Sequence, residues 1–297
     1  MKNRFNNFGH LLKLTFKIWY NRDPFRESSI IAYSAIFSLP GLLIIVITLA
    51  GYFLGADAVS GRLHKQIAQA MGNATADQIQ NMVMMANRSK DSFWASIIAI
   101  ITILIGATGV FVQMQKSLNV IWEVKATAAK SGILSFLKTR LFSFGLIVSI
   151  AFLLLISLVL SSLFSAMSAW ALQHWSESLL MIFLILNFVF SILMITVLFA
   201  IMFKILPDAK IKWNLVWVGA FFTSLLFAIG KSALGFYFGK LNPGSAYGAA
   251  GSIIIILLWA SYSSMIVFFG AEFTKVYSDY YYGEVPASEN AVNVPNS

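Results

Sequence analysis

Residues 251–271 read GSIIIILLWASYSSMIVFFGA and carry no charged side chain. An α-helix rises about 1.5 Å per residue and the hydrocarbon core of a bilayer is about 30 Å thick, so about 20 apolar residues can cross it. This stretch therefore predicts a transmembrane helix. Five further apolar stretches are long enough to cross, and one of them is interrupted only by Lys231. They predict spans at about 30–54, 93–113, 141–165, 179–205 and 214–239.

The amino-acid composition indicates a protein that is mostly surrounded by lipid. Of its 297 residues, 59% are hydrophobic and only 11% are charged, less charge than the surface of a soluble domain requires. No small-residue cleavage site follows a short apolar core, so the first apolar stretch is expected to be a retained span, not a signal peptide. The fold class we predict is all-α: a polytopic membrane protein with six transmembrane helices, forming one domain over residues 1–283.

The distribution of Lys and Arg predicts the orientation. Fifteen of these residues lie in the leader, in the second-to-third and fourth-to-fifth connections and after the sixth span, while five lie in the remaining connections. Excess Lys and Arg mark the cytoplasmic side, so both termini are expected in the cytoplasm of a bacterial inner membrane. The net charge of +9 sits at span ends, which favours anionic lipid over nucleic acid as the partner. The oligomeric state stays open, a homo-oligomer included.

Three segments outside the spans have their own patterns. Apolar residues recur every three or four positions in 4–20, which predicts an interfacial amphipathic helix. The outer connection 56–91 carries two apolar stripes separated by Gly72 and Asn73, which predicts two short helices on the outer surface or roofing the bundle. Thr75 and Gln78 have capping-box spacing for the second of these helices. Residues 284–297 are polar and contain two prolines, so we expect a disordered tail.

The first span contains two proline signals. Asp23 before Pro24 is a plausible start for its helix. Pro40, in the middle, removes a backbone hydrogen bond, and a neighbour such as Ser38 must compensate. Two interpretations follow: a packing kink or a gating hinge.

Residues able to carry catalysis are scattered. His10, His64 and His174 stand alone, and no pair has metal-ligand spacing on one side of the membrane. The carboxylates sit at helix ends, and the chain has neither a phosphate-cradling loop nor a nucleophile elbow. With no cysteine for a thiolate, we expect no enzyme and no cofactor.

Lys231 is the exceptional ionisable residue, because a lysine at the centre of a membrane helix costs about 2.5–3.5 kcal/mol on the insertion scale. Its stem can reach the outer head groups, or its ammonium can face a polar cavity. Counting along the spans places Asn187, Ser261 and Tyr262 at similar depth. Together these four side chains predict a hydrated pocket suited to an anionic head group. Glu272 is expected at the cytoplasmic end, paired with Lys275, Lys204 or Arg22.

Several motifs point to a family. They are Ala32-Tyr33 with Phe37-Ser38-Leu39, Gly106-Ala-Thr-Gly109-Val-Phe111, Leu118-Asn119-Val-Ile-Trp122, Leu206-Pro207-Asp208-Ala-Lys-Ile-Lys212-Trp213, Val218-Gly219-Ala220, Gly230-Lys231, Ser245-Ala-Tyr247-Gly248-Ala-Ala-Gly251-Ser252, Leu258-Trp259 and Gly270-Ala271-Glu272-Phe273. On these motifs, nearly the whole chain resembles the YihY/virulence factor BrkB family. The resemblance implies a six-helix inner-membrane protein with both termini inside, and it implies no settled activity. Pro40 stands one position earlier than in many members, which moves the kink around the helix by about 100°.

The motif residues also have physical interpretations. Pro207 is expected to end the fourth span, Asp208 to cap the fifth and Trp213 to lie at the interface. Asn119 and Trp122 share one helix face, and packing is as good an explanation for them as ligand contact. Tyr247, Gly248 and Gly251 are expected to form a turn into the sixth span. The motif residues to which we assign a structural or functional role are Pro40, Asn119, Trp122, Pro207, Asp208, Trp213, Tyr247, Gly248, Gly251, Trp259 and Glu272.

Two functions from different classes follow. The first is translocation of a lipid or other amphiphilic anion, for which Lys231, the pocket and the Pro40 kink are the reasons. The second is a non-transporting scaffold that organises the envelope, in which Lys231 reaches the head groups. A ribonuclease, the older label of the family, lacks the required metal constellation in this sequence.

Overall fold

A computed structural model describes residues 2–87, 108–127, 145, 177–241, 243–289 and 291–294. Residues 108–121 are helical as well. The named elements are α1 (Lys2–Asn21), α2 (Pro24–Leu54), α3 (Ala56–Met71), α4 (Asn73–Asn87), β1 (Val124–Ala126), α7 (Glu177–Ile205), α8 (Trp213–Leu241), the short 3₁₀ helix η1 (Ser245–Ala250), α9 (Gly251–Tyr282) and β2 (Ala291–Asn293).

Four of the described helices are long and apolar enough to cross a membrane: they cover Pro24–Thr48, Ile185–Ile205, Trp213–Leu241 and Gly251–Tyr282. They correspond to the first, fourth, fifth and sixth predicted spans. Most of the predicted span 93–113 and all but residue 145 of the span 141–165 lie outside the described residues. Large apolar side chains are exposed around the helices, as lipid permits and water does not, including Ile229 and Phe236. The chain is a multi-pass membrane protein.

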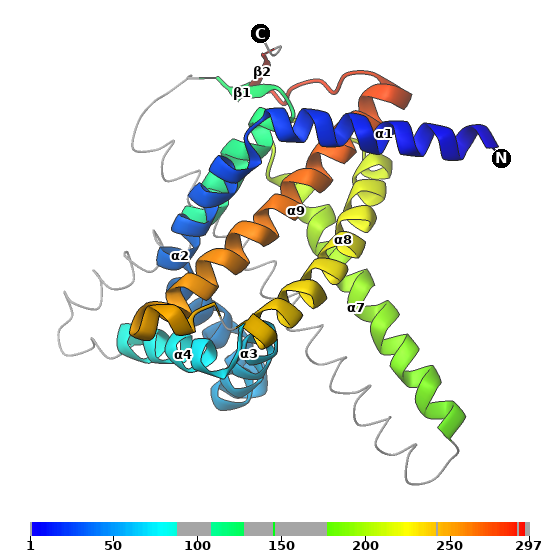
Figure 1. Cartoon of the computed structure of the whole chain (residues 1–297). Helices are drawn as coiled ribbons and strands as arrows, with labels where there is room; N and C mark the ends of the chain where they lie inside the picture. The colour runs from blue at the N-terminus through cyan, green and yellow to red at the C-terminus, as the bar shows by residue number, and fades with distance from the viewer. Residues whose placement is uncertain are drawn as a thin grey trace.

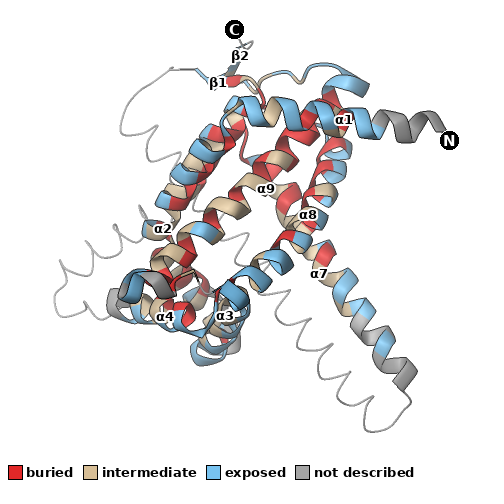
Figure 2. Ribbon diagram, viewed as in Figure 1, coloured by how far each residue is buried: buried red, intermediate tan, exposed pale blue. Residues whose placement is uncertain are grey.

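Helix α9 is the centre of the described bundle. It packs against α2 on one side and α8 on another, and α7 packs against α8. Buried residues follow the faces on which α8 and α9 meet, as the red segments of Figure 2 show. Helix α1 crosses one end of the bundle, where β1 and β2 also lie (Figure 1). We call this the α1 end, and we call the opposite end, where α3 and α4 lie, the roof end.

The α8–α9 interface depends on two glycines. A Cβ at Gly219 would overlap the Thr274 side chain, and a Cβ at Gly270 would overlap that of Thr223. Each threonine hydroxyl is buried and donates 2.7 Å to the glycine carbonyl one turn earlier in its own helix. The helices therefore approach closely, as membrane helices do at small residues. Both glycines stand in motifs quoted above, but their packing role was not predicted, although each stands four residues before its threonine, a small-xxx-small signal in both helices.

The start of α2 agrees with the sequence. Asp23 is its N-cap with φ 52°, and its carboxylate accepts the Arg26 N–H at 3.4 Å. Pro40 lies inside the helix. The Ser38 hydroxyl donates 2.8 Å to the Ser34 carbonyl and accepts the Val110 N–H at 3.2 Å. Ser38 thus joins α2 to the helix at 108–121 close to the proline.

The roof end follows the predicted division at Gly72 but not the predicted cap. Helix α4 begins at Asn73, and the Ala76 N–H donates 3.2 Å to the Gly72 carbonyl. The Thr75 hydroxyl is therefore already inside the helix, where it is buried with no hydrogen-bond partner in the part of the chain that the structure describes. The expected capping box does not form because the helix starts two residues before Thr75.

The segment after α9 differs from the expected disordered tail. Residues 284–289 and 291–294 have a defined path, and β2 pairs antiparallel with β1. Strand pairing satisfies backbone groups that water would otherwise solvate, and it needs no apolar periodicity in the tail itself. A polar composition therefore did not prevent an ordered segment here.

Candidate functional site

Lys231 is exposed on α8, between the buried Gly230 and the exposed Ser232. A Cβ at Gly230 would lie 2.9 Å from Cε1 and 3.2 Å from Oη of Tyr262 on α9. The Tyr262 ring therefore rests on the α8 backbone, one residue away from Lys231. These two members of the predicted pocket lie near each other.

The other two members lie on different faces. The Ser261 hydroxyl is 3.1 Å from the hydroxyl of Ser28, in the first turns of α2, so Ser261 faces α2 while Tyr262 faces α8. Asn187 is half-buried on α7, and its Oδ1 is buried with no hydrogen-bond partner among the described residues. No hydrogen bond in the described structure joins Asn187 to Lys231. The pocket of four side chains stays a prediction.

A charged cluster at the α1 end is the most connected polar site of the described chain. Arg22 lies at the junction of α1 and α2, and its Nη1 donates 2.8 Å to the Val120 carbonyl. Its Nη2 is 3.0 Å from Glu123 Oε1, and its Nη1 is 3.7 Å from Glu272 Oε2. The expected ion pair of Glu272 with Arg22 is confirmed. Glu123 was not foreseen as its second partner.

Lys275 extends this cluster along α9. Its Nζ is 3.0 Å from Glu123 Oε1 and 3.2 Å from Asp279 Oδ2. The Glu272 side chain is only 1% exposed, and its Oε1 has no hydrogen-bond partner in the described residues. A buried carboxylate loses its hydration and depends on nearby cations, here Arg22 first of all. We name Arg22, Glu123, Glu272, Lys275 and Asp279 the Arg22 cluster.

Asn119 and Asp208 come from two motifs far apart in the sequence and form a reciprocal pair. Asn119 Nδ2 donates 2.8 Å to Asp208 Oδ2, and the Asp208 N–H donates 2.8 Å to Asn119 Oδ1. Gln115 Nε2 also donates to Asp208 Oδ2, at 3.4 Å. The prediction that Asp208 caps the fifth span is wrong, because α8 begins only at Trp213 and the carboxylate is engaged by Asn119.

The remaining motif residues have different surroundings. Pro207 is buried directly after the end of α7, as predicted. Trp122 is 2% exposed, and its indole N–H has no hydrogen-bond partner among the described residues. Trp213 is exposed, with Lys204 Nζ 5.7 Å from its ring centroid. Trp259 meets the Phe227 ring edge-on at 6.4 Å.

The turn into α9 is built as the sequence predicts. Gly248 has φ 54°, a left-handed conformation that glycine adopts without strain. Gly251 approaches Gly244 so closely that a Cβ on either would meet the backbone of the other. Tyr247 is exposed beside this turn.

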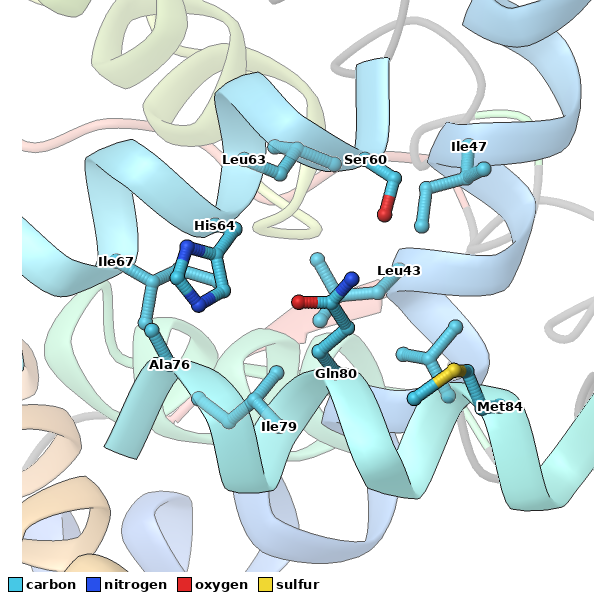
Figure 3. Close-up of a pocket in the computed structure, with 11 residues that line it drawn as sticks. Leu43, Ile47, Ser60, Leu63, His64, Ile67, Ala76, Ile79, Gln80 and Met84 are labelled. Atoms are coloured by element: carbon cyan, nitrogen blue, oxygen red, sulfur yellow. The ribbon is translucent and has the colours of Figure 1, made fainter. Parts of the chain in front are cut away.

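Two small cavities lie at the two ends of the bundle. At the roof end, a cavity of about 50 Å³ has apolar walls from α2, α3 and α4, and the polar side chains of Ser60, His64 and Gln80 lie at it (Figure 3). His64 Nε2 is 2.7 Å from Asp77 Oδ1, which joins α3 to α4. At the α1 end, a cavity of about 80 Å³ is bounded by Trp122, members of the Arg22 cluster and the tail; we call it the inner cavity. Among the described residues, no group of three His, Cys, Asp or Glu side chains could hold a metal ion.

Comparisons with known proteins agree with the motifs. A UPF0761 membrane protein of Pseudoalteromonas atlantica is 26% identical over 271 residues, which cover 89% of this chain and 84% of that protein. The ribonuclease-like protein YfkH of Bacillus subtilis is 26% identical over 280 residues, covering 88% of this chain and 92% of its own. No solved structure matches the chain. The model of the family described as virulence factor BrkB matches residues 16–294, and the chain therefore belongs to the BrkB virulence factor family of membrane proteins.

Proposed function

We propose that this protein translocates a lipid or other amphiphilic anion across the bacterial cytoplasmic membrane, with six spans and both termini in the cytoplasm. The observation that carries the proposal is the exposed cation of Lys231 within the apolar helix α8, beside the Gly230–Tyr262 contact. A lysine there is costly unless its charge meets water or an anion. The anionic head group of a lipid supplies this negative charge, while the acyl chains of the same lipid stay in the bilayer.

The orientation in this proposal is supported by the arrangement of the described helices. Helix α1 and strand β2 lie at the same end of the bundle (Figure 1). Lys210, Lys275 and Arg22 are at this end too, in contact with the tail or with the Arg22 cluster. Excess positive charge at one end marks it as cytoplasmic.

In this proposal, the structure represents the transporter in its resting state, before a head group passes Lys231. At the α1 end, ion pairs join α1, α9 and the segment after the helix at 108–121, while at the roof end α3 and α4 pack on each other and on α2. Among the described residues, contacts between helices hold both ends together. Movement of a head group past Lys231 then requires one end to open.

The test is reconstitution in liposomes with fluorescent anionic lipids in both leaflets. Wild type is expected to accelerate lipid exchange between leaflets, and Lys231→Met is expected to lose most of that acceleration. Lys240→Met is the matched control, because Lys240 is in the last turn of the same helix and its charge is already at the interface. The proposal would be refuted if vesicles with wild type, vesicles with Lys231→Met and empty vesicles all showed the same rate of lipid exchange.

A second candidate is a non-transporting scaffold of the envelope, alone or as a homo-oligomer. The observation that favours it is the packing of the α1 end, where Arg22 binds three partners at once and the tail is ordered. In a scaffold, Lys231 only reaches the head groups, so the same exchange assay separates the two functions. The name of the relative YfkH raises ribonuclease activity as a third candidate, tested by RNA cleavage with the purified protein and with its His→Ala variants.

A further inference from the structure

The segment 284–294 is held at the α1 end mainly by its backbone. Strand β2 pairs with β1 in the register Val124–Asn293, Lys125–Val292 and Ala126–Ala291 (Figure 1). The Val294 N–H adds a bond of 2.8 Å to the Glu123 carbonyl. The partner of this edge is therefore the segment that directly follows the membrane-spanning part of the chain.

The same segment also binds the connection between α7 and α8. The Ser288 N–H donates 2.9 Å to the Asp208 carbonyl, and the Lys210 N–H donates 2.9 Å to the Pro286 carbonyl. Ala209 and Ala287 form the bridge between these bonds. Two connections that are far apart in the sequence, one near Glu123 and one near Asp208, are thus held by one short segment.

Asn293 gives the segment its shape. Its Oδ1 accepts the Ala287 N–H at 2.7 Å, and its Nδ2 donates 3.2 Å to the Val285 carbonyl. These two bonds close residues 285–293 into a loop that presents Val285 and Ala287 to the apolar core. A single exposed side chain therefore fixes the form in which the segment docks.

The loop forms one wall of the inner cavity. The bundle contributes Trp122, Glu123, Lys275 and Asp279 to its walls, while Glu284, Val285 and Asn293 come from the segment. The charged floor belongs to the Arg22 cluster and is already partly open to solvent, since the Glu123 and Asp279 side chains are 27% and 36% exposed. Moving the segment away removes one wall and widens this opening.

The contacts that hold the segment are weak compared with those beneath it. Both Lys125 and Val292 are exposed, and the ion pair Lys210–Glu289 is exposed on both sides, whereas Glu272 is fully buried. Exposed pairs contribute little, and a two-stranded ladder of this length is marginal by itself. We infer that residues 284–289 and 291–294 form a removable strap, docked on β1 and on the 206–211 connection, which narrows the inner cavity and widens it on release. This inference does not depend on the proposed transport function.

The docked position is tested by a disulfide. The chain has no native cysteine, so Lys125→Cys/Val292→Cys introduces the sole pair. Directly opposed residues of an antiparallel pair have Cα separations of about 4.5–5.5 Å, within the range of a disulfide. Mild oxidation of the full chain in membrane vesicles is expected to give an intramolecular bond. Lys65→Cys/Val292→Cys, with Lys65 on α3 at the roof end, is the matched control and is expected to stay reduced.

The narrowing of the cavity is tested by the reactivity of a cavity residue. Lys275→Cys places a thiol in the inner cavity at a position where the wild-type side chain is only 14% exposed. Adding Asn293→Ala removes both bonds that shape the strap, and the rate of maleimide labelling at position 275 is expected to rise about tenfold, equal to a loss of about 1.4 kcal/mol in docking free energy. Asn293→Asp, which keeps the acceptor for the Ala287 N–H, is expected to give a smaller rise. Labelling of Ala76→Cys, a position 1% exposed on α4 at the roof end, reports on general unfolding and is expected to be unchanged by Asn293→Ala.

Two results would overturn the strap. One is the absence of the 125–292 disulfide under conditions in which wild-type fold and stability are retained. The other is equal labelling of position 275 with and without Asn293→Ala. Neither readout involves lipid movement, so the strap and the proposed translocation succeed or fail separately.

Discussion

Thr274 of α9 fills the space that a side chain at Gly219 of α8 would occupy. Its hydroxyl is satisfied within its own helix, by the Gly270 carbonyl, so the contact across the interface is one of shape and not of hydrogen bonding. The reciprocal contact of Thr223 with Gly270 lies beside it. The two helices consequently have a fixed distance and register where they cross.

Gly219→Ala is expected to destabilise the protein by about 1–3 kcal/mol, the usual cost of overpacking a close contact. The added methyl group meets the Thr274 side chain and must push the helices apart. Thermal unfolding in detergent measures the effect. Gly235→Ala in the same helix is the control, since nothing lies within 4 Å of its Cβ position. A melting temperature for Gly219→Ala equal to that of Gly235→Ala would show that the interface is not tight.

Arg22→Ala is expected to cost about 3–5 kcal/mol, because it leaves Glu272 buried without its nearest cation. Arg22→Met/Glu272→Met, which removes both charges, is expected to be closer to wild type. Arg26→Ala is the control, as its pair with Glu27 is exposed and worth about 0–1 kcal/mol. Unfolding in a denaturing detergent gives the comparison, and a single variant no worse than the double one would refute the role of Arg22.

Asn119→Ala is expected to cost about 2–3 kcal/mol, because hydrogen bonds to a charged group are worth about 1.5–3 kcal/mol each and the Asp208 N–H also loses its acceptor. Gln115→Ala removes only the bond of 3.4 Å and is expected to cost less. A double-mutant cycle with Asp208→Ala measures the coupling directly. A coupling energy near zero would mean that the pair does not connect the two segments.

Thr75→Val is expected to be neutral or stabilising by about 1 kcal/mol, since the buried hydroxyl has no partner in the described chain and valine has the same shape without it. Thr15→Val is the matched control: Thr15 is equally buried, but its hydroxyl donates 2.8 Å to the Leu11 carbonyl, so its loss is expected to destabilise. The melting temperature of each variant measures the effect. A shift of both melting temperatures in the same direction would contradict this prediction.

The sequence predicted what local signals control. The apolar stretches located α2, α7, α8 and α9, Asp23 marked the start of α2, and Gly72 separated α3 from α4, because each depends on neighbouring residues alone. Even there, α2 begins several residues before the predicted span. Helix starts follow caps, whereas hydropathy follows the lipid boundary.

Apart from the capping box at Thr75, the features that the sequence did not reveal join segments distant in sequence. Asn119 and Asp208 were both singled out, yet nothing in one sequence says that an amide in one motif binds a carboxylate 89 positions later. Depth along a helix likewise leaves rotation undetermined, which is why Ser261 and Tyr262 were grouped although they face different helices. The ordered strap was missed because backbone pairing leaves little trace in side-chain composition.

The position of Arg22 between α1 and α2 connects the helix that crosses the bundle end with the bundle interior. Helix α1 lies across the bundle end (Figure 1). Arg22, which directly follows α1, forms an ion pair with Glu272, which is buried in α9. A movement that tilts α1 therefore lengthens the Arg22–Glu272 pair or carries α9 along.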